Sequence, residues 1–124
     1  NKPESQSIDF RPLISDSGNK RKVLTMLVKE SEANKEELVE AIRNKDRMRI
    51  KEIIHRMFPM WEMLGIAEEL QEYRNLVHDD SSGDQIMKEW TLKITASLDR
   101  LVSAAENEIY SLIRQENEKE NTDS

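Results

Sequence analysis

The sequence predicts an all-α protein, an antiparallel up-down four-helix bundle with a short extra N-terminal helix. Apolar residues recur at helical spacing over four long segments, and no segment shows the alternation of a strand. Only three glycines and three prolines occur among the 124 residues. Sandwiches and barrels need more turn residues than this. Four helices with short connections pack most simply as an antiparallel bundle.

The first two predicted helices precede residue 44. Residues 9–14 read as a short helix or capping turn, with Phe10 and Leu13 as apolar anchors. Residues 15–18 form a turn with N-cap candidates, and a long helix then covers about 19–43. Its apolar positions are Leu24, Leu27, Val28, Leu38 and Ile42.

The other helices follow from capping signals and apolar periodicity. Residues 44–46 form a tight break between two helices, and Asp46 can cap the second of them. That helix runs to about Leu64, and Gly65 is a plausible stop for it. A third long helix is predicted from 66 to about 77, then a loop over 78–84, and a last helix over about 85–115. The predicted buried stripe of the last helix is Ile86, Trp90, Ile94, Leu98, Leu101, Ala105, Ile109 and Leu112.

The length suits one domain with one core. We expect a polar tail over 1–7, the bundle over 8–115, and a polar, disordered tail over 116–124. No apolar run approaches the roughly 18 residues that cross a membrane. The absence of cysteine excludes disulfides and thiolate metal sites. Because the chain does not begin with Met and both ends are polar, we expect a domain excised from a longer protein.

The charge is unevenly distributed. The net charge of −6 argues against general nucleic-acid binding. Residues 43–56 nevertheless contain six basic and two acidic residues, a local sum of +4. A solvated helix face is the common explanation of such a run, and a docking surface for an acidic partner is the alternative. The six basic residues are Arg43, Lys45, Arg47, Arg49, Lys51 and Arg56.

His55 is the most informative residue of this basic segment. At about 100° per residue, it points roughly 150° away from the apolar stripe of its predicted helix. A histidine that faces water on an amphipathic helix does not fill a core. A neutral imidazole offers a nitrogen lone pair, so His55 is a candidate nucleophile. The stripe consists of Ile50, Ile53, Ile54, Met57, Trp61 and Leu64.

Metal and nucleotide chemistry are poorly supported. Glu52 and His55 match one Glu-x-x-His element of di-iron bundles, but such a site needs two elements and further inward-facing glutamates. His78, the other histidine, follows Asn75 by three residues and suits the C-terminal end of a helix. No His-Glu-x-x-His motif and no Gly-rich phosphate loop is present. We therefore predict no metal site and no ATP-binding segment.

Phe58 and Pro59 each leave two interpretations open. Pro59 lies inside the predicted helix and cannot donate the hydrogen bond that the His55 carbonyl would accept. The proline either bends the helix around the core or opens space for a partner above the imidazole. Phe58, about 60° from His55 around the helix, is either a rim residue covered by a neighbouring helix or an exposed contact for a partner.

The pattern from Asp9 to about Leu112 resembles a histidine-containing phosphotransfer (HPt) domain of a bacterial phosphorelay. In that family an acidic residue precedes the histidine-bearing helix, as Asp46 does, and a glycine ends the motif, as Gly65 does. The opening Asp9-Phe10 segment is also similar. Phe58 and Pro59 stand where the family usually has Lys and Gly, but the subgroup attached to hybrid two-component sensor kinases has an apolar-Pro pair there.

The resemblance implies a phosphocarrier function. His55 would accept a phosphoryl group from a receiver-domain aspartate and pass it to another receiver domain, without autonomous kinase activity. We expect no cofactor on this chain, with Mg²⁺ supplied by the receiver. The expected docking residues are Lys51, Arg56, Phe58, Pro59 and Glu62, with Arg49 as a further cation.

The same resemblance sets expectations for context. The domain would be a monomer that contacts neither nucleic acid nor membrane, and its partners would be receiver domains of response regulators or of a hybrid kinase. It would be cytoplasmic, as at the inner end of a membrane-bound sensor. A non-catalytic helical adaptor and the dimerisation bundle of a signalling kinase are the rival hypotheses. A dimerisation bundle predicts a self-associating apolar stripe, whereas a phosphocarrier predicts one reactive histidine.

Overall fold

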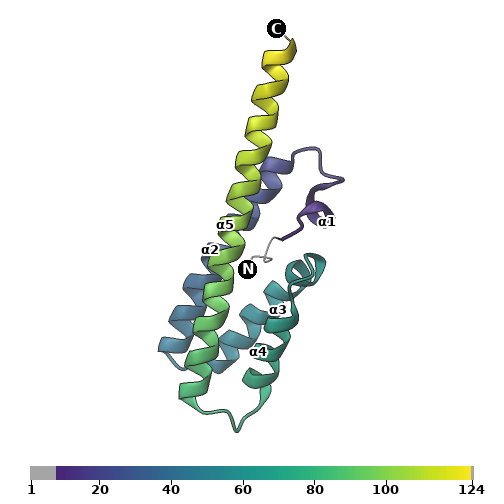
Figure 1. The fold of residues 1–124 in the computed structure, drawn as a ribbon. Coiled ribbons are helices and arrows are strands. Elements are labelled where there is room, and N and C mark those ends of the chain that lie inside the picture. The colour runs from purple at the N-terminus through teal and green to yellow at the C-terminus, as the bar shows by residue number, and fades with distance from the viewer. Residues whose placement is uncertain (1–7, 124) are drawn as a thin grey trace, which may run out of the picture.

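The computed structural model of the protein describes residues 8–123, which form five helices and their connections without any strand (Figure 1). The prediction of an all-α protein is therefore confirmed. No helix in this part of the chain has both the length and the apolar character needed to cross a bilayer. The helices are α1 (Arg11–Ile14), α2 (Lys20–Arg43), α3 (Arg47–Met63), α4 (Glu68–His78) and α5 (Asp84–Asp123).

The two longest helices, α2 and α5, pack along each other and form the spine of the molecule. Helix α3 packs against α2 and α4, and α4 packs in turn against α5. Figure 1 shows α3 and α4 beside the lower parts of the spine, with the short α1 near its upper part. Each of the four longer helices therefore contacts two of the others, which places α3 between α2 and α4.

Two side-chain caps fix where α2 and α3 begin. The amide oxygen of Asn19 accepts a hydrogen bond from the backbone N–H of Lys22 at 3.0 Å. The carboxylate of Asp46 accepts one from the N–H of Arg49, also at 3.0 Å, as the sequence predicted. Such caps satisfy N–H groups that have no partner within the helix.

The turn between α2 and α3 is unusually tight. Lys45 has a φ of +54° and is the one non-glycine residue in the described chain with positive φ. The N–H of Asp46 donates to the carbonyl of Ala41 at 2.8 Å, and the N–H of Lys45 donates to that of Ile42. This pair of bonds is a Schellman motif, in which glycine usually occupies the left-handed position.

Gly65 ends α3 by the same geometry. Its φ is +71°, the N–H of Ile66 donates to the carbonyl of Trp61 at 2.9 Å, and its own N–H donates to that of Glu62. The prediction that Gly65 stops the helix is confirmed. Helix α4 begins at Glu68, two residues later than its apolar pattern predicted, and Ile66 lies half-buried in the connection.

The apolar stripe of α3 lies in the core as predicted, and no residue of that stripe is more than 7% exposed. Phe10 and Ile14 close the core at α1, while Leu13 is half-buried. The buried side chains from Phe10 to Ala105 form one continuous core. Its fully buried large side chains are Tyr73, Leu24, Leu38, Ile50, Ile53, Ile54, Met57, Leu70, Ile94, Leu98, Leu101 and Val77.

The start of α5 is rotated relative to the prediction. Ile86 is 40% exposed, and Met87 is buried in its place. The reason is a buried polar pair: the hydroxyls of Tyr73 and Thr91 lie 2.6 Å apart. Since Thr91 donates its one hydroxyl proton to the carbonyl of Met87 at 2.8 Å, Tyr73 must be the donor to Thr91. With this hydrogen bond in place, Thr91 faces the core and Trp90 is only half-buried.

The end of α5 also differs from the prediction. The helix continues to Asp123 and does not end near Gln115, so the expected disordered tail over 116–124 is helical as far as Asp123. The segment lacks glycine and proline, and its Glu and Lys residues are good helix formers. An ion pair of 2.9 Å between Arg21 and Glu116 ties this end to α2. The predicted tail over 1–7 and the terminal Ser124 lie outside the described residues.

Candidate functional site on the exposed face of α3

His55 projects from the middle of α3 into solvent. Its side chain is exposed, whereas the two preceding residues, Ile53 and Ile54, are 0% and 1% exposed. The predicted outward orientation is confirmed. Because the opposite face of the helix is fixed in the core, the imidazole is presented from a firmly anchored backbone.

A strip of exposed residues surrounds this histidine. Met48 and Glu62 lie seven residues before and after His55, and two helical turns place all three nearly on one line. Met48 is 69% exposed, and Met63, at the end of the helix, is 50% exposed. These two methionines were not predicted as part of the site, although the seven-residue spacing from Met48 to His55 is visible in the sequence. We call Met48, Lys51, Glu52, His55, Pro59, Glu62 and Met63 the α3 outer face.

Arg56 does not belong to this outer face, because it reaches sideways to α2. Its Nη2 donates to Oε1 of Glu37 at 2.6 Å and to Oδ1 of Asn34 at 2.8 Å, and its Nε also contacts Asn34 at 3.2 Å. The predicted docking cation is therefore engaged within the domain. Glu37 and Asn34 stand 19 and 22 positions before Arg56 in the sequence and belong to a different helix. No sequence pattern indicates such a pairing, so this contact could not be predicted.

Arg49 shares the same carboxylate. Its Nη2 donates to Oε1 of Glu37 at 2.8 Å, and its Nη1 to Oε1 of Glu52 at 3.0 Å. The hydrogen bond from Arg56, more than the nearby charge of Arg49, holds the pKa of Glu37 below its usual range. Two of the predicted cations are thus neutralised locally. Lys51, half-buried and one turn before His55, has no ion-pair partner among residues 8–123.

Arg47 has a structural task at the base of α3. Its guanidinium donates to the carbonyls of Val77 and Asp79 at 3.0 and 3.1 Å, and to that of Ser82 at 2.7 Å. These carbonyls end α4 and line the following loop, where backbone acceptors lack helical partners. Arg47 therefore fastens the loop after α4 to the first turn of α3.

Phe58 is half-buried beneath a residue of α4. The guanidinium carbon of Arg74 lies 5.2 Å from the centre of the Phe58 ring, a cation–π distance. Of the two interpretations of Phe58, the rim residue covered by a neighbouring helix fits this contact. Arg74 was not predicted as a neighbour of Phe58, because the two residues belong to different helices.

Pro59 is exposed and lies inside α3, which continues to Met63. Proline has no N–H, so the His55 carbonyl lacks its usual helical donor at that position. Both interpretations of Pro59 are compatible with this placement.

His55 lies on the exposed side of α3, outside the hollow beside this helix. A hollow of about 360 Å³ lies between α2 and α3, but it is lined by residues such as Asn34, Glu37, Arg56 and Met60, and not by His55. In the described part of the chain, no three His, Asp or Glu side chains gather closely enough to hold a metal ion. Glu52 of the Glu-x-x-His element is turned toward Arg49. Among the described residues, His55 therefore neither lines this hollow nor belongs to a metal-binding group.

Comparisons with known protein families, with curated proteins and with solved structures give no match to this chain.

Proposed function

We propose that this chain is an HPt domain, a cytoplasmic phosphocarrier of a two-component phosphorelay that receives a phosphoryl group on His55. The observation that carries the proposal is the exposure of this imidazole on a helix whose opposite face is fully buried. An exposed histidine loses no hydration on folding, and it adds no packing contact to the core. A role in chemistry with a partner accounts for its position.

We further propose that α2, α3, α4 and α5 form the antiparallel up-down bundle of that family, with α1 as the extra N-terminal helix. The closed cycle of helix contacts and the short connections support this architecture. Asp46 and Gly65 bracket the histidine-bearing helix as the resemblance implies. Burial of Phe10 agrees with its predicted role at the opening of the domain.

The transfer step uses the lone pair of an imidazole nitrogen. That nitrogen attacks the phosphorus of an aspartyl phosphate on a receiver domain, and a P–N bond forms as the bond between phosphorus and the carboxylate oxygen breaks. The aspartate leaves with that electron pair, and the imidazole becomes a phosphoramidate. Alignment and charge neutralisation supply most of such catalysis. The exposed surface of α3 around His55 suits a partner that brings the acidic pocket and Mg²⁺.

Lys51 is the cation of this chain best placed to assist. It lies one turn from His55 and is free of ion pairs within the described residues. Arg56, by contrast, would have to leave Glu37 and Asn34 before it could contact a phosphoryl group. Pro59, Glu62 and the exposed methionines would form the remaining contact with the receiver, while Phe58 supports them from below.

The decisive experiment supplies a phosphorylated receiver domain to the His55→Gln variant, with His78→Gln as the matched control. His78 is the exposed last residue of α4. We expect label on the native chain and on the control, and none on His55→Gln at unchanged helicity. The label should be labile in acid and stable in base, as a phosphoramidate is. Label retained on His55→Gln would exclude the proposal.

The two rival functions give other results. A non-catalytic adaptor would bind a partner equally well with His55→Gln and would never carry label. A kinase dimerisation bundle would sediment as a dimer, whereas the proposed phosphocarrier sediments as a monomer. Labelling of the isolated chain by ATP and Mg²⁺ alone would contradict the absence of autonomous kinase activity.

A further inference from the structure

A second cationic surface lies at the base of the molecule, away from His55. A groove of about 320 Å³ opens where the end of α2, the first turns of α3 and the start of α5 meet. Its walls carry four basic side chains and one carboxylate, a local sum of +3 on a chain whose net charge is −6. We call it the basal groove, and its charged lining residues are Arg43, Lys45, Arg47, Lys88 and Asp84.

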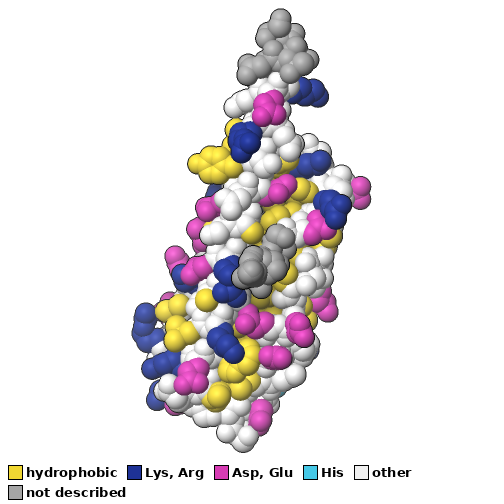
Figure 2. Space-filling view, in the orientation of Figure 1, with side chains coloured by type: hydrophobic (Ala, Val, Ile, Leu, Met, Phe, Trp, Pro, Cys, Tyr) yellow, Lys and Arg dark blue, Asp and Glu magenta, His cyan; other side chains and the backbone are white. Residues whose placement is uncertain are grey.

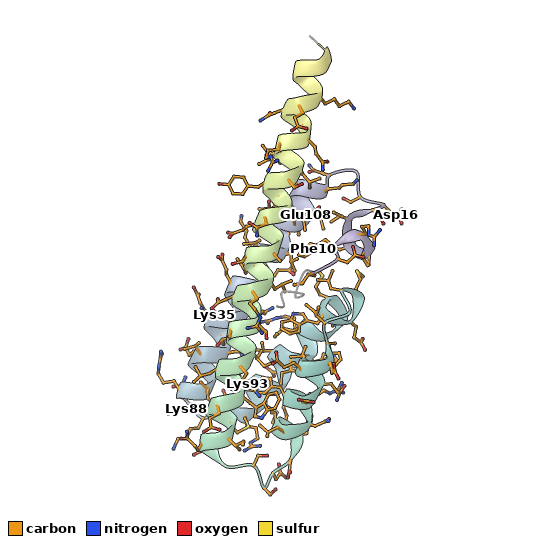
Figure 3. All side chains as sticks on the ribbon, in the orientation of Figure 1. Phe10, Asp16, Lys35, Lys88, Lys93 and Glu108 are labelled. Carbon is orange, nitrogen blue, oxygen red and sulfur yellow. The ribbon has the colours of Figure 1, made fainter. Side chains whose placement is uncertain are left out.

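Figure 2 shows Lys and Arg side chains gathered at the lower left of the molecule, where α2 ends and α5 begins. Figure 3 places Lys88 on this lower part of α5. Neither Arg43 nor Lys88 has a hydrogen-bond or ion-pair partner among the described residues. The ammonium of Lys45 lies 3.3 Å from a carboxylate oxygen of Asp84, and both side chains are more than two-thirds exposed. The donors of Arg43 and Lys88 are thus unused, whereas Arg47 is engaged by the backbone carbonyls described above.

Lys45 occupies a position that local structure disfavours, because its backbone is left-handed at a site where glycine would avoid the steric cost of a Cβ. Arg43, in the last turn of α2, and Lys88, four residues after Asp84 on α5, need no such explanation. A residue that breaks a local rule tends to mark a functional site.

The floor of the groove is apolar, since Ile42, Ile50 and Met87 line it. Ammonium and guanidinium donors above such a floor suit the several acceptor oxygens of a phosphoryl group. The groove is also separate from His55, because Arg47 and His55 are eight residues, or roughly 12 Å, apart along the helix. We propose that the basal groove binds a small, soluble phosphorylated anion through Arg43, Lys45 and Lys88.

The test is a titration of the full chain with inorganic pyrophosphate at constant ionic strength. Binding is monitored by NMR through the chemical shifts of the backbone amides. We expect saturable shifts confined to residues near the basal groove. Lys45→Gly is the sharpest variant, because it relieves the left-handed backbone and should raise the melting temperature while it weakens pyrophosphate binding. Loss of one charge-assisted hydrogen bond should weaken binding by about tenfold. Weaker binding together with greater stability cannot come from misfolding.

Two further variants complete the experiment. Asp84→Asn removes the competing carboxylate and should tighten pyrophosphate binding, while Lys29→Ala, which removes one positive charge from another part of α2, should leave it unchanged. Unsaturable shifts spread over all lysines, or equal weakening by Lys29→Ala and Lys45→Gly, would overturn the proposal. Binding to phosphatidylglycerol vesicles without binding to pyrophosphate would overturn it as well, since the ligand would then be a lipid surface. Phosphotransfer to His55 does not enter any of these measurements.

Discussion

The two faces of α3 differ as much as any two regions of the molecule. On the inner face, Ile50, Ile53, Ile54, Met57 and Trp61 are at most 3% exposed. On the outer face, Met48 and Met63 are at least half exposed, and His55 projects between them. The same backbone therefore has one face fixed in the core and one face open to solvent, and the proposed function places the chemistry on the open face. Substitutions on the inner face should alter stability, and those on the outer face should alter transfer.

The neighbouring pair Ile54 and His55 gives the largest contrast. Ile54→Ala should lower the free energy of unfolding by about 2–5 kcal/mol, because it leaves a cavity in the core. His55→Ala should change that free energy by less than about 0.5 kcal/mol, because the side chain lies in water. Urea denaturation of both variants measures the difference. A similar loss of stability in both would show that the outer face also supports the fold.

Tyr73 extends the buried side of the comparison to pH. Burial raises the pKa of Tyr73 to about 12, against an ordinary value of 10, and the hydrogen bond with Thr91 offsets this only in part. Between pH 10 and about 12 the unfolded chain loses this proton while the folded chain keeps it. The stabilisation from Tyr73 is thus complete below pH 10 and falls by about 2–3 kcal/mol as the pH rises through that window.

Alkaline denaturation tests this expectation, with Tyr73→Phe as the variant and the exposed Tyr110 as the control position. Tyr73→Phe should remove most of the loss of stability between pH 10 and 12, and Tyr110→Phe should not. An unchanged alkaline profile in Tyr73→Phe would mean that another group causes the loss.

The arginines of α3 offer a contrast of intermediate size. Arg47 bonds three backbone carbonyls of the α4 end and its loop, so Arg47→Ala should cost about 2 kcal/mol. Arg56, which is about half exposed, bonds only side chains, and Arg56→Ala should cost about 1 kcal/mol or less. Thermal melts rank the two variants, and equal melting temperatures would contradict this assignment. Hydrogen exchange in residues 79–83 should increase in Arg47→Ala alone.

Pro59→Ala has the smallest expected effect on stability. Alanine restores a backbone donor for the His55 carbonyl, but it also frees the unfolded chain that proline restricts. The free energy of unfolding should hold or rise by up to about 1 kcal/mol. The rate of phosphotransfer should fall, because a helix of different shape changes the orientation of the imidazole. Melting temperature and transfer rate are measured on the same variant, and a collapse of stability would assign Pro59 to packing alone.

The local signals in the sequence were reliable for α3. The apolar stripe, the Asp46 cap and the Gly65 stop can all be read within a single helix, and the exposure of His55 follows from that stripe. The error at Ile86 has a different origin, because the Tyr73–Thr91 hydrogen bond joins two helices and rotates α5. Periodicity cannot anticipate a buried hydroxyl pair.

The candidate site was predictable in part for the same reason. The position of His55 depends on its own helix, whereas the state of Arg49 and Arg56 depends on Glu37 of α2. Charge counting along residues 43–56 gave +4, yet it could not include a carboxylate from another element. At the end of α5 the local sequence did carry the information, since a polar segment without glycine or proline continues as helix to Asp123.

The carboxylate shared by Arg49 and Arg56 has a consequence for the speed of encounter. The guanidinium groups of Arg49 and Arg56 and the carboxylates of Glu37 and Glu52 sum to zero charge at N–O distances of 2.6 to 3.0 Å, so their field fades much faster than the field of isolated cations. An acidic partner that diffuses toward α3 would therefore feel mainly Lys51, and long-range attraction would add little to its arrival rate. A shallow dependence of that rate on ionic strength would distinguish this surface from one with six independent positive charges. Recognition at His55 would then depend on fit at contact.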